Sequence, residues 1–206
     1  MSANSDVVAY LQRKSSAALG RPVAPTETDM LHKYLILLIK WQRSQRLVGS
    51  DEPRWIVDNI IVDSLLFRRV LPVSIARLAD VGSGAGVPGI PLAVVMPSSA
   101  VELIEARQKR GSFLAAVIRE LTLRNCRLLN RRLEEVRGEL AGRFNAVVMR
   151  CAGNPTSLVA DVSAILAPGG VVVASGPPRR VRISAGAWLE VEGPNGVRRF
   201  WVYHAT

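Results

Sequence analysis

The sequence predicts an α/β fold, a mostly parallel seven-stranded sheet with helices on both faces and a final antiparallel strand, preceded by a helical N-terminal region. Three observations lead to this prediction. Helical patterns fill residues 1–73, β-type and helical segments alternate from Ile75 onward, and Asn195-Gly196 marks a hairpin turn between the last two β-type segments. We therefore expect a helical extension over residues 1–73, packed on an α/β domain over residues 74–206.

The N-terminal region divides into three helical segments. Asp6 to Leu19 predicts a short helix, and Pro25-Thr26 followed by Asp29 predicts the capped start of a second. Glu52-Pro53 predicts the start of a third, which ends before Leu71-Pro72. The second helix has an apolar face and a basic remainder, which suits either a solvated surface or contact with RNA. Its apolar face consists of Leu31, Tyr34, Leu35, Leu38 and Trp41, and its basic residues are Lys33, Lys40, Arg43 and Arg46.

The alternating region predicts seven strands and four helices. The expected strands are Arg77–Val81, Ala100–Ile104, Cys126–Leu129, Phe144–Met149, Gly170–Ala174, Ala187–Val191 and Arg199–Tyr203. The expected helices are Ile90–Met96, Gln108–Leu123, Leu133–Leu140 and Pro155–Leu166.

An acid-led glycine loop, Asp80-Val81-Gly82-Ser83-Gly84-Ala85-Gly86-Val87-Pro88-Gly89, follows the first expected strand. Its small residues are expected to let backbone N–H groups approach a ligand. The loop fits two templates, the dinucleotide fingerprint Gly84-x-Gly86-x-x-Gly89 and the S-adenosylmethionine (SAM) loop Asp80-x-Gly82-x-Gly84-x-Gly86 of class I methyltransferases. Glu105, which follows the next strand, suits the ribose of either ligand.

The acid at the start of the loop favours SAM. A carboxylate at Asp80 would repel a pyrophosphate, whereas it can face the amino group of SAM or hold the loop. The loop also follows a long helical region rather than opening the chain, and a closing antiparallel strand is typical of methyltransferases. A nicotinamide-dependent oxidoreductase and a glycine-rich turn that binds nothing are the weaker alternatives.

Composition points to a polyanionic partner. The 206 residues are 49% hydrophobic, enough for one core, and carry a formal net charge of +10, which favours nucleic acid. Arginine dominates the basic residues and suits phosphate or guanine, although a GC-rich genome also enriches arginine. With two cysteines and two histidines, the chain predicts neither a disulfide framework nor a zinc site. We expect a cytoplasmic monomer without a transmembrane or targeting segment.

Several blocks together resemble the bacterial 16S rRNA guanine-N7 methyltransferases, a family also called glucose-inhibited division protein B. The glycine loop and its continuation Ile90-Pro91-Leu92 form the most specific block. The others, in chain order, are Lys40-Trp41, Val62-Asp63-Ser64-Leu65, Lys109-Arg110 with Phe113-Leu114, and Arg132-Leu133-Glu134-Glu135. The resemblance spans most of the chain.

The resemblance implies roles for individual residues. Gly82, Gly84 and Gly86, together with Asp80 and Ser83 of the same loop, would bind the methionine end of SAM. Glu105 would hold the ribose, and Leu133 and Glu134 would flank the adenine. Arg150, which follows the fourth strand, would lie at the methyl-transfer site as the catalytic residue and also contact SAM. The substrate would be 16S rRNA or the small-subunit particle.

The chain departs from the family where RNA binding and catalysis are expected. This chain has Arg46-Leu47-Val48 where the family has Asn-Leu-Thr, and Ile60 where the family has a histidine. It has Ser175-Gly176 where the family has Lys-Gly. A divergent relative that methylates another RNA, or a non-catalytic RNA-binding protein, therefore stays open. Cys151 could serve a cytosine-C5 enzyme as nucleophile, but it has no partnered base and is interpreted as a packing residue. The helices before Pro72 and a basic segment containing Arg179, Arg180 and Arg182 are the candidate RNA surface.

Overall fold

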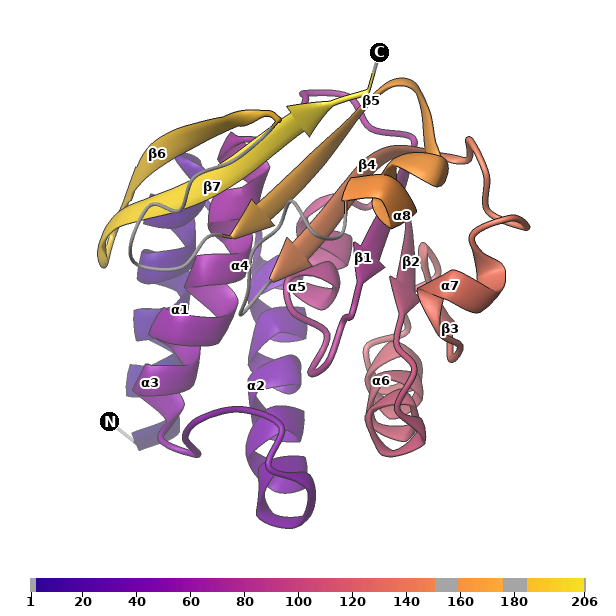
Figure 1. Ribbon diagram of the computed structural model, residues 1–206. Helices are drawn as coiled ribbons and strands as arrows, with labels where there is room; N and C mark the ends of the chain where they lie inside the picture. The colour runs from indigo at the N-terminus through magenta and orange to yellow at the C-terminus, as the bar shows by residue number, and fades with distance from the viewer. Residues whose placement is uncertain (1–2, 151–158, 176–184, 206) are drawn as a thin grey trace.

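The computed structural model describes residues 3–150, 159–175 and 185–205 (Figure 1). A seven-stranded sheet with the order β3-β2-β1-β4-β5-β7-β6 forms its centre. β7 pairs antiparallel with both of its neighbours, β5 and β6, and the other pairs are parallel. The strands are β1 (Arg77–Val81), β2 (Ala100–Ile104), β3 (Cys126–Leu129), β4 (Phe144–Arg150), β5 (Leu166–Ser175), β6 (Ala187–Gly193) and β7 (Gly196–His204). The predicted fold class is confirmed.

The order in which the chain adds strands to the sheet reverses between β1 and β4. β1 pairs with β2 on one side and β4 on the other, so the chain winds outward in both directions from this point. Open α/β sheets bind ligands at such a switch point, outside the carboxyl ends of the strands. The glycine loop begins at this place.

One expected boundary between helix and strand is wrong. The helix predicted to reach Leu166 is described as α8 (Val159–Ala164), and β5 already begins at Leu166. Leu166 pairs with Phe144, but Ala146 pairs with Val171, so an irregularity lies between the two contacts. Pairing with β4 therefore overrides the local helical pattern, and the region around Gly169, whose φ is 72°, absorbs the extra residues. The expected start at Pro155 lies outside the described residues.

The N-terminal helices are α1 (Ala3–Leu19), α2 (Pro25–Gln45) and a continuous helical run from Pro53 to Arg69. That run contains α3 (Pro53–Ile56), the π-helical turn η1 (Val57–Val62), α4 (Asp63–Leu65) and the 3₁₀ turn η2 (Leu66–Arg69). Glu52 accepts a hydrogen bond from the Arg54 N–H at 2.9 Å, as expected for the cap of the third helix.

The capping acid of α2 differs from the expected one. Glu27 accepts a hydrogen bond from the N–H of Ala24 at 2.8 Å, whereas Asp29 forms an ion pair with Lys33 at 2.8 Å. Glu27 stands at the third helical position, from which a side chain reaches back to the residue before the helix. The expected helix start at Pro25 is correct, but Asp29 lies too far into the helix to cap it.

The two faces of the sheet are covered unequally. Helices α1 to α4, α5 (Gly89–Val95) and α6 (Gln108–Glu120) share one hydrophobic core with Leu78, Val148 and Phe200. The other face carries a smaller core, covered in the described residues by α7 (Leu133–Val136) and α8 (Figure 1). The N-terminal helices therefore share a core with the sheet, and a domain division after residue 73 stays a prediction. No described helix is both long and apolar enough to cross a membrane.

Arg69 ties the end of α1 to the edge of the sheet. Its guanidinium donates hydrogen bonds to the carbonyls of Ala17 at 2.7 Å, Ala18 at 2.6 Å and Glu192 at 2.9 Å. The last carbonyls of a helix have no partner within the helix, so a side-chain donor here satisfies them.

We expect Arg69→Met to lower the free energy of unfolding by about 1–2 kcal/mol, because charged hydrogen bonds are lost at a partly exposed position. Urea denaturation followed by circular dichroism measures the change. Arg119→Met is the control, since Arg119 forms only an exposed pair with Glu120 and its loss should cost less than about 0.5 kcal/mol. Equal stabilities of the two variants would contradict the bridging role.

Candidate active site

A buried carboxylate organises the glycine loop that follows β1. Asp80 has no exposed surface, and its Oδ2 accepts a hydrogen bond from the N–H of Gly89 at 2.9 Å. Ser83 donates its hydroxyl to the carbonyl of Asp80 at 2.8 Å. A Cβ on Gly89 would lie 2.5 Å from Asp80 Oδ2, so glycine is required there. The loop is thus closed on itself around Asp80.

The backbone N–H groups of the loop are used inside the protein. Gly82 and Ser83 donate to the carbonyl of Ile104 at 2.9 and 3.2 Å, and Gly84 donates to Glu105 Oε2 at 2.8 Å. The N–H groups of Gly86 and Val87 both donate to the carbonyl of Ser83. The expectation that these groups approach a ligand is therefore wrong. A pyrophosphate needs free N–H groups, so the geometry disfavours a dinucleotide.

Tyr34 holds the loop from the helical side. Its hydroxyl, on α2, donates to the carbonyl of Ala85 at 2.7 Å, and its side chain is fully buried. Burial raises the pKa of Tyr34 above its ordinary value, which keeps the phenol protonated as a donor. The sequence indicated Tyr34 only as a core residue.

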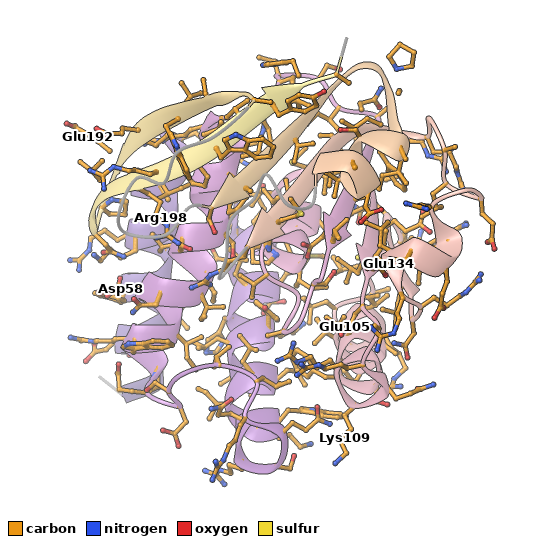
Figure 2. The ribbon with its side chains drawn as sticks, viewed as in Figure 1. Asp58, Glu105, Lys109, Glu134, Glu192 and Arg198 are labelled. Atoms are coloured by element: carbon orange, nitrogen blue, oxygen red, sulfur yellow. The ribbon has the colours of Figure 1, made fainter. Side chains whose placement is uncertain are left out.

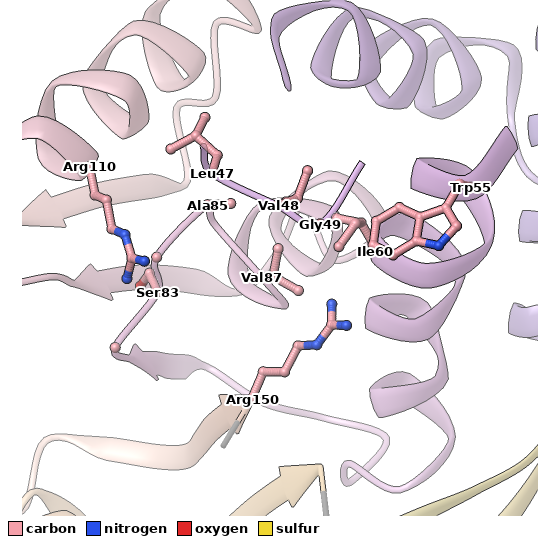
Figure 3. Close-up of a pocket in the computed structure, with 12 residues that line it drawn as sticks. Leu47, Val48, Gly49, Trp55, Ile60, Ser83, Ala85, Val87, Arg110 and Arg150 are labelled. Carbon is pink, nitrogen blue, oxygen red and sulfur yellow. The ribbon is translucent and has the colours of Figure 1, made fainter. Parts of the chain in front are cut away.

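A cavity of about 280 Å³ opens beside the loop (Figure 3). Three segments of the N-terminal region and two arginines complete its wall. Figure 3 shows Arg110 beside Ser83 and Arg150 reaching from the end of β4 toward the opposite part of the cavity. The residues that line it are Leu47, Val48, Gly49, Trp55, Ile60, Gly82, Ser83, Gly84, Ala85, Val87, Arg110 and Arg150.

The predicted site residues fall into two groups. Gly82, Ser83, Gly84 and Arg150 line the cavity, and Gly82 and Gly84 adopt positive φ angles of 72° and 57°. The remaining residues, Asp80, Gly86, Glu105, Leu133 and Glu134, lie outside its lining.

Each residue outside the lining has its own position. Gly86 packs where an added Cβ would lie 2.5 Å from Ile90, so it serves the loop rather than the cavity. Glu105 is 4% exposed and accepts hydrogen bonds from the N–H groups of Gly84 and Arg107, both at 2.8 Å. On α7, Leu133 is buried and Glu134 is exposed, and Figure 2 shows Glu134 on the same side of the molecule as Glu105.

Arg150 belongs to a cluster with one carboxylate and a second arginine. Its Nε lies 3.6 Å from Asp63 Oδ2, and Arg198 Nε lies 2.6 Å from Asp63 Oδ1. Burial lowers the pKa of Arg150 from its ordinary value, and the negative charge of Asp63 opposes this shift. The cluster carries two positive charges and one negative charge, and Arg150 is its member that lines the cavity.

The sequence assigned no site role to Arg110 and Trp55, which line the cavity, or to Asp63, which lies beside Arg150. Asp63 and Arg110 stand inside the family blocks, so their positions could have been noticed, but nothing in the sequence pairs Asp63 with Arg150 and Arg198. For Trp55, the sequence shows only helical spacing, which does not indicate a role in the site. The departures at Val48 and Ile60 line the cavity, whereas Arg46 lies outside its lining, so part of the divergence concerns the wall that faces the loop.

Other predicted residues lie apart from the cavity. Ser175 is buried at the end of β5. Cys151 and the basic residues Arg179, Arg180 and Arg182 lie outside the described residues.

Comparison with known proteins agrees with this architecture. The family model described as GidB, rRNA small subunit methyltransferase G, matches residues 27–176. The chain belongs to this family. A ribosomal RNA small subunit methyltransferase G of Dichelobacter nodosus is 35% identical over 164 residues, which are 79% of this chain and 76% of that protein. One from Xanthomonas campestris is 32% identical over 204 residues, 92% of this chain and 94% of that protein.

A solved structure supports the fold. The O-methyltransferase TomG of Streptomyces achromogenes, solved in complex with SAM, has a TM-score of 0.57 over 86% of this chain and 90% of its own, at 15% identity. At this identity the likeness concerns the fold alone. The family match confirms the expected family and its methyltransferase class, and SAM is the cofactor of such a methyltransferase.

Asp80 should give the SAM-free protein a characteristic pH dependence. Burial raises the pKa of Asp80 from 3.8 to about 7, so the folded protein binds a proton that the unfolded chain has released. Stability from this group is fully present below about pH 4 and is lost as pH rises through about 7, by roughly 4 kcal/mol at most.

We expect Asp80→Asn to remove this decline between pH 4.5 and 8, because the side chain no longer titrates. Urea denaturation across that range, without SAM, gives the free energy of unfolding at each pH. Asp29→Asn is the control, because Asp29 forms an exposed pair with Lys33. A slope in Asp80→Asn that equals that of the unmodified protein would contradict the assignment.

Proposed function

We propose that this protein transfers a methyl group from SAM to N7 of a guanine in small-subunit rRNA. The observation that carries the proposal is the chemistry of the cavity wall. Its described lining combines glycine-loop atoms and apolar side chains with the guanidinium groups of Arg110 and Arg150, and it contains no carboxylate, histidine or lysine. The described wall is suited to placing a ring and not to removing a proton.

Guanine N7 suits such a wall because it carries an in-plane lone pair and no proton. SAM, when bound, supplies an electrophilic methyl group on a sulfonium. An exocyclic amine or a hydroxyl would have to lose a proton, and the hydroxyl of Ser83 is already donated to Asp80. Placement of two reactants can contribute roughly 7–11 kcal/mol to catalysis, so a site without a base can still be effective.

The loop residues fit SAM by shape. Gly82 and Gly84 present surface without side chains to the cavity, and no heavy atom lies within 4 Å of a Cβ added to Gly82. Glu105 keeps acceptor capacity on both carboxylate oxygens after its two N–H contacts, so it can accept the ribose hydroxyls. Leu133 and Glu134 are proposed to flank the adenine. Asp80 acts as a positioning residue for the loop.

The substrate assignment rests on the names of the relatives and on charge. The similar proteins of Dichelobacter nodosus and Xanthomonas campestris are called ribosomal RNA small subunit methyltransferases, and this chain carries a net charge of +10. The deep major groove of A-form RNA hides N7, so the target guanine must lie in a loop, a single strand or an opened intermediate. The same function implies a cytoplasmic protein, and we propose that it acts as a monomer.

An altered RNA target is the second candidate. Val48 and Ile60 replace more polar family residues and lie together with Leu47 and Trp55 on the cavity wall. This wall is apolar and aromatic, so it favours stacking over hydrogen bonding to the base. A different guanine, or a different RNA, would fit such a wall, while the glycine-loop side of the cavity would bind SAM in the same way.

Nucleoside mass spectrometry of small-subunit rRNA tests the proposed function. We expect a strain without the protein to lack one 7-methylguanosine, which the unmodified protein restores and Arg150→Gln does not. Arg119→Gln is the matched control and should restore it. Loss of a different methylated nucleoside would support the altered target, and an unchanged nucleoside profile would overturn the enzymatic proposal.

Glu105→Gln should weaken SAM binding by about tenfold or more, because one carboxylate oxygen becomes an amide donor facing N–H groups. Isothermal calorimetry with SAM measures the affinity. Glu102→Gln is the control, because Glu102 lies within β2 and does not contact the glycine loop, and it should bind SAM as the unmodified protein does. Equal affinities of the two variants would refute the ribose role.

A further inference from the structure

A second basic site lies at the end of the sheet opposite the glycine loop. A groove of about 460 Å³ is lined there by Arg77, Arg124, Arg127 and Arg143, with Glu102 as the only carboxylate of its lining. The parallel strands β1 to β4 all begin at this end and all point toward the cofactor loop. β1 has five residues, so the groove lies roughly 17 Å from the loop.

The groove forms where the second face of the sheet is thinly covered. Arg77 begins β1 and Arg127 lies on β3, in register with Glu102 on β2. Arg124 and Arg143 stand just before β3 and β4. In the described residues this face is covered by the short helices α7 and α8, which leave the starts of β1 to β3 open.

The backbone beneath the groove is held firmly while the arginine side chains stay exposed. Asn125 Nδ2 donates to the carbonyls of Ala93, Met96 and Ser99 at 3.0, 3.2 and 3.1 Å, which fixes the turn that carries Arg124. The N–H of Arg77 donates to Asn145 Oδ1 at 3.0 Å. The groove is therefore preformed, and a ligand would need to order only the side chains.

The charges of the groove are not neutralised within the protein. Among the described residues, no side-chain hydrogen bond or ion pair engages Arg77, Arg124, Arg127 or Arg143. Some surface arginines elsewhere are paired, since Arg21, Arg119 and Arg137 each contact a carboxylate. With four guanidinium groups and one carboxylate, the groove carries an excess of three positive charges.

We propose that this groove binds consecutive phosphates of an RNA segment that flanks the methylated nucleotide. The guanidinium groups are spread across the starts of four adjacent strands, β3, β2, β1 and β4, roughly 14 Å, which suits a run of phosphates rather than one anion. Because the groove and the cavity lie at opposite ends of the strands, only a long RNA contacts both. The identity of the RNA rests on the proposed function, whereas phosphate binding rests on the groove itself.

The test compares two double variants with the same change in charge, in filter binding to a complete 16S rRNA transcript without SAM. Arg124→Gln/Arg127→Gln removes two groove arginines, and Arg119→Gln/Arg137→Gln removes two paired arginines elsewhere. We expect the groove variant to bind about tenfold more weakly near physiological salt. Its slope of log affinity against log salt should fall by about 1.4–1.8, since each lost phosphate contact removes about 0.7–0.9.

The other readouts separate the outcomes. Both variants should bind SAM normally by calorimetry, and both should bind guanosine as the unmodified protein does, because a nucleoside carries no phosphate for the groove. Equal losses of RNA affinity in the two double variants, or no loss in the groove variant, would overturn the proposal. Binding of inorganic phosphate to the groove as tightly as RNA would also overturn it. The test measures RNA binding and not methyl transfer. Its result can therefore be interpreted even if the enzymatic proposal fails.

Discussion

The hydrogen bond from the N–H of Gly89 to the buried carboxylate of Asp80 fixes the geometry on which the cofactor loop, α5 and the cavity depend. It joins the end of β1 to the first residue of α5, and the chain between them must therefore form a closed loop. Tyr34 adds a second contact from α2, so the N-terminal helices also depend on this loop. A buried carboxylate with a raised pKa is costly to ionise, and proteins keep such a group where it organises a site.

The two ends of the parallel strands place arginines in two different environments. At the carboxyl ends of the strands, Arg150 lies against Asp63 and Arg198, so its charge is oriented and partly compensated. At the amino ends, the groove arginines have no carboxylate partners among the described residues. The first arrangement suits one defined contact beside reacting atoms, and the second suits a polyanion whose phosphates differ in position. A net charge of +10 alone does not distinguish these two uses.

Agreement between sequence and structure is best where local pattern and tertiary pairing coincide. The bounds of β1, β2 and β3 are those expected, since each is a short apolar run between turn residues. β5 disagrees because pairing with β4 recruits Leu166 into the sheet. The π-helical turn at Val57–Val62 also has no sequence signal, and it contributes Ile60 to the cavity.

The sequence by itself determined the family, the order of strands and helices along the chain, and the glycine loop. Each of these depends on residues close together in the chain, and the motif of the glycine loop is specific. It also indicated Arg150 and Glu105, since Arg150 is the last residue of β4 and Glu105 follows β2 at the same edge of the sheet. Only the tertiary structure decided that the N–H groups of the loop are occupied, that Asp63 joins Arg150 to Arg198, and that four arginines form one groove. Those contacts join residues far apart in the chain, and their geometry arises only when the sheet brings the strand ends together.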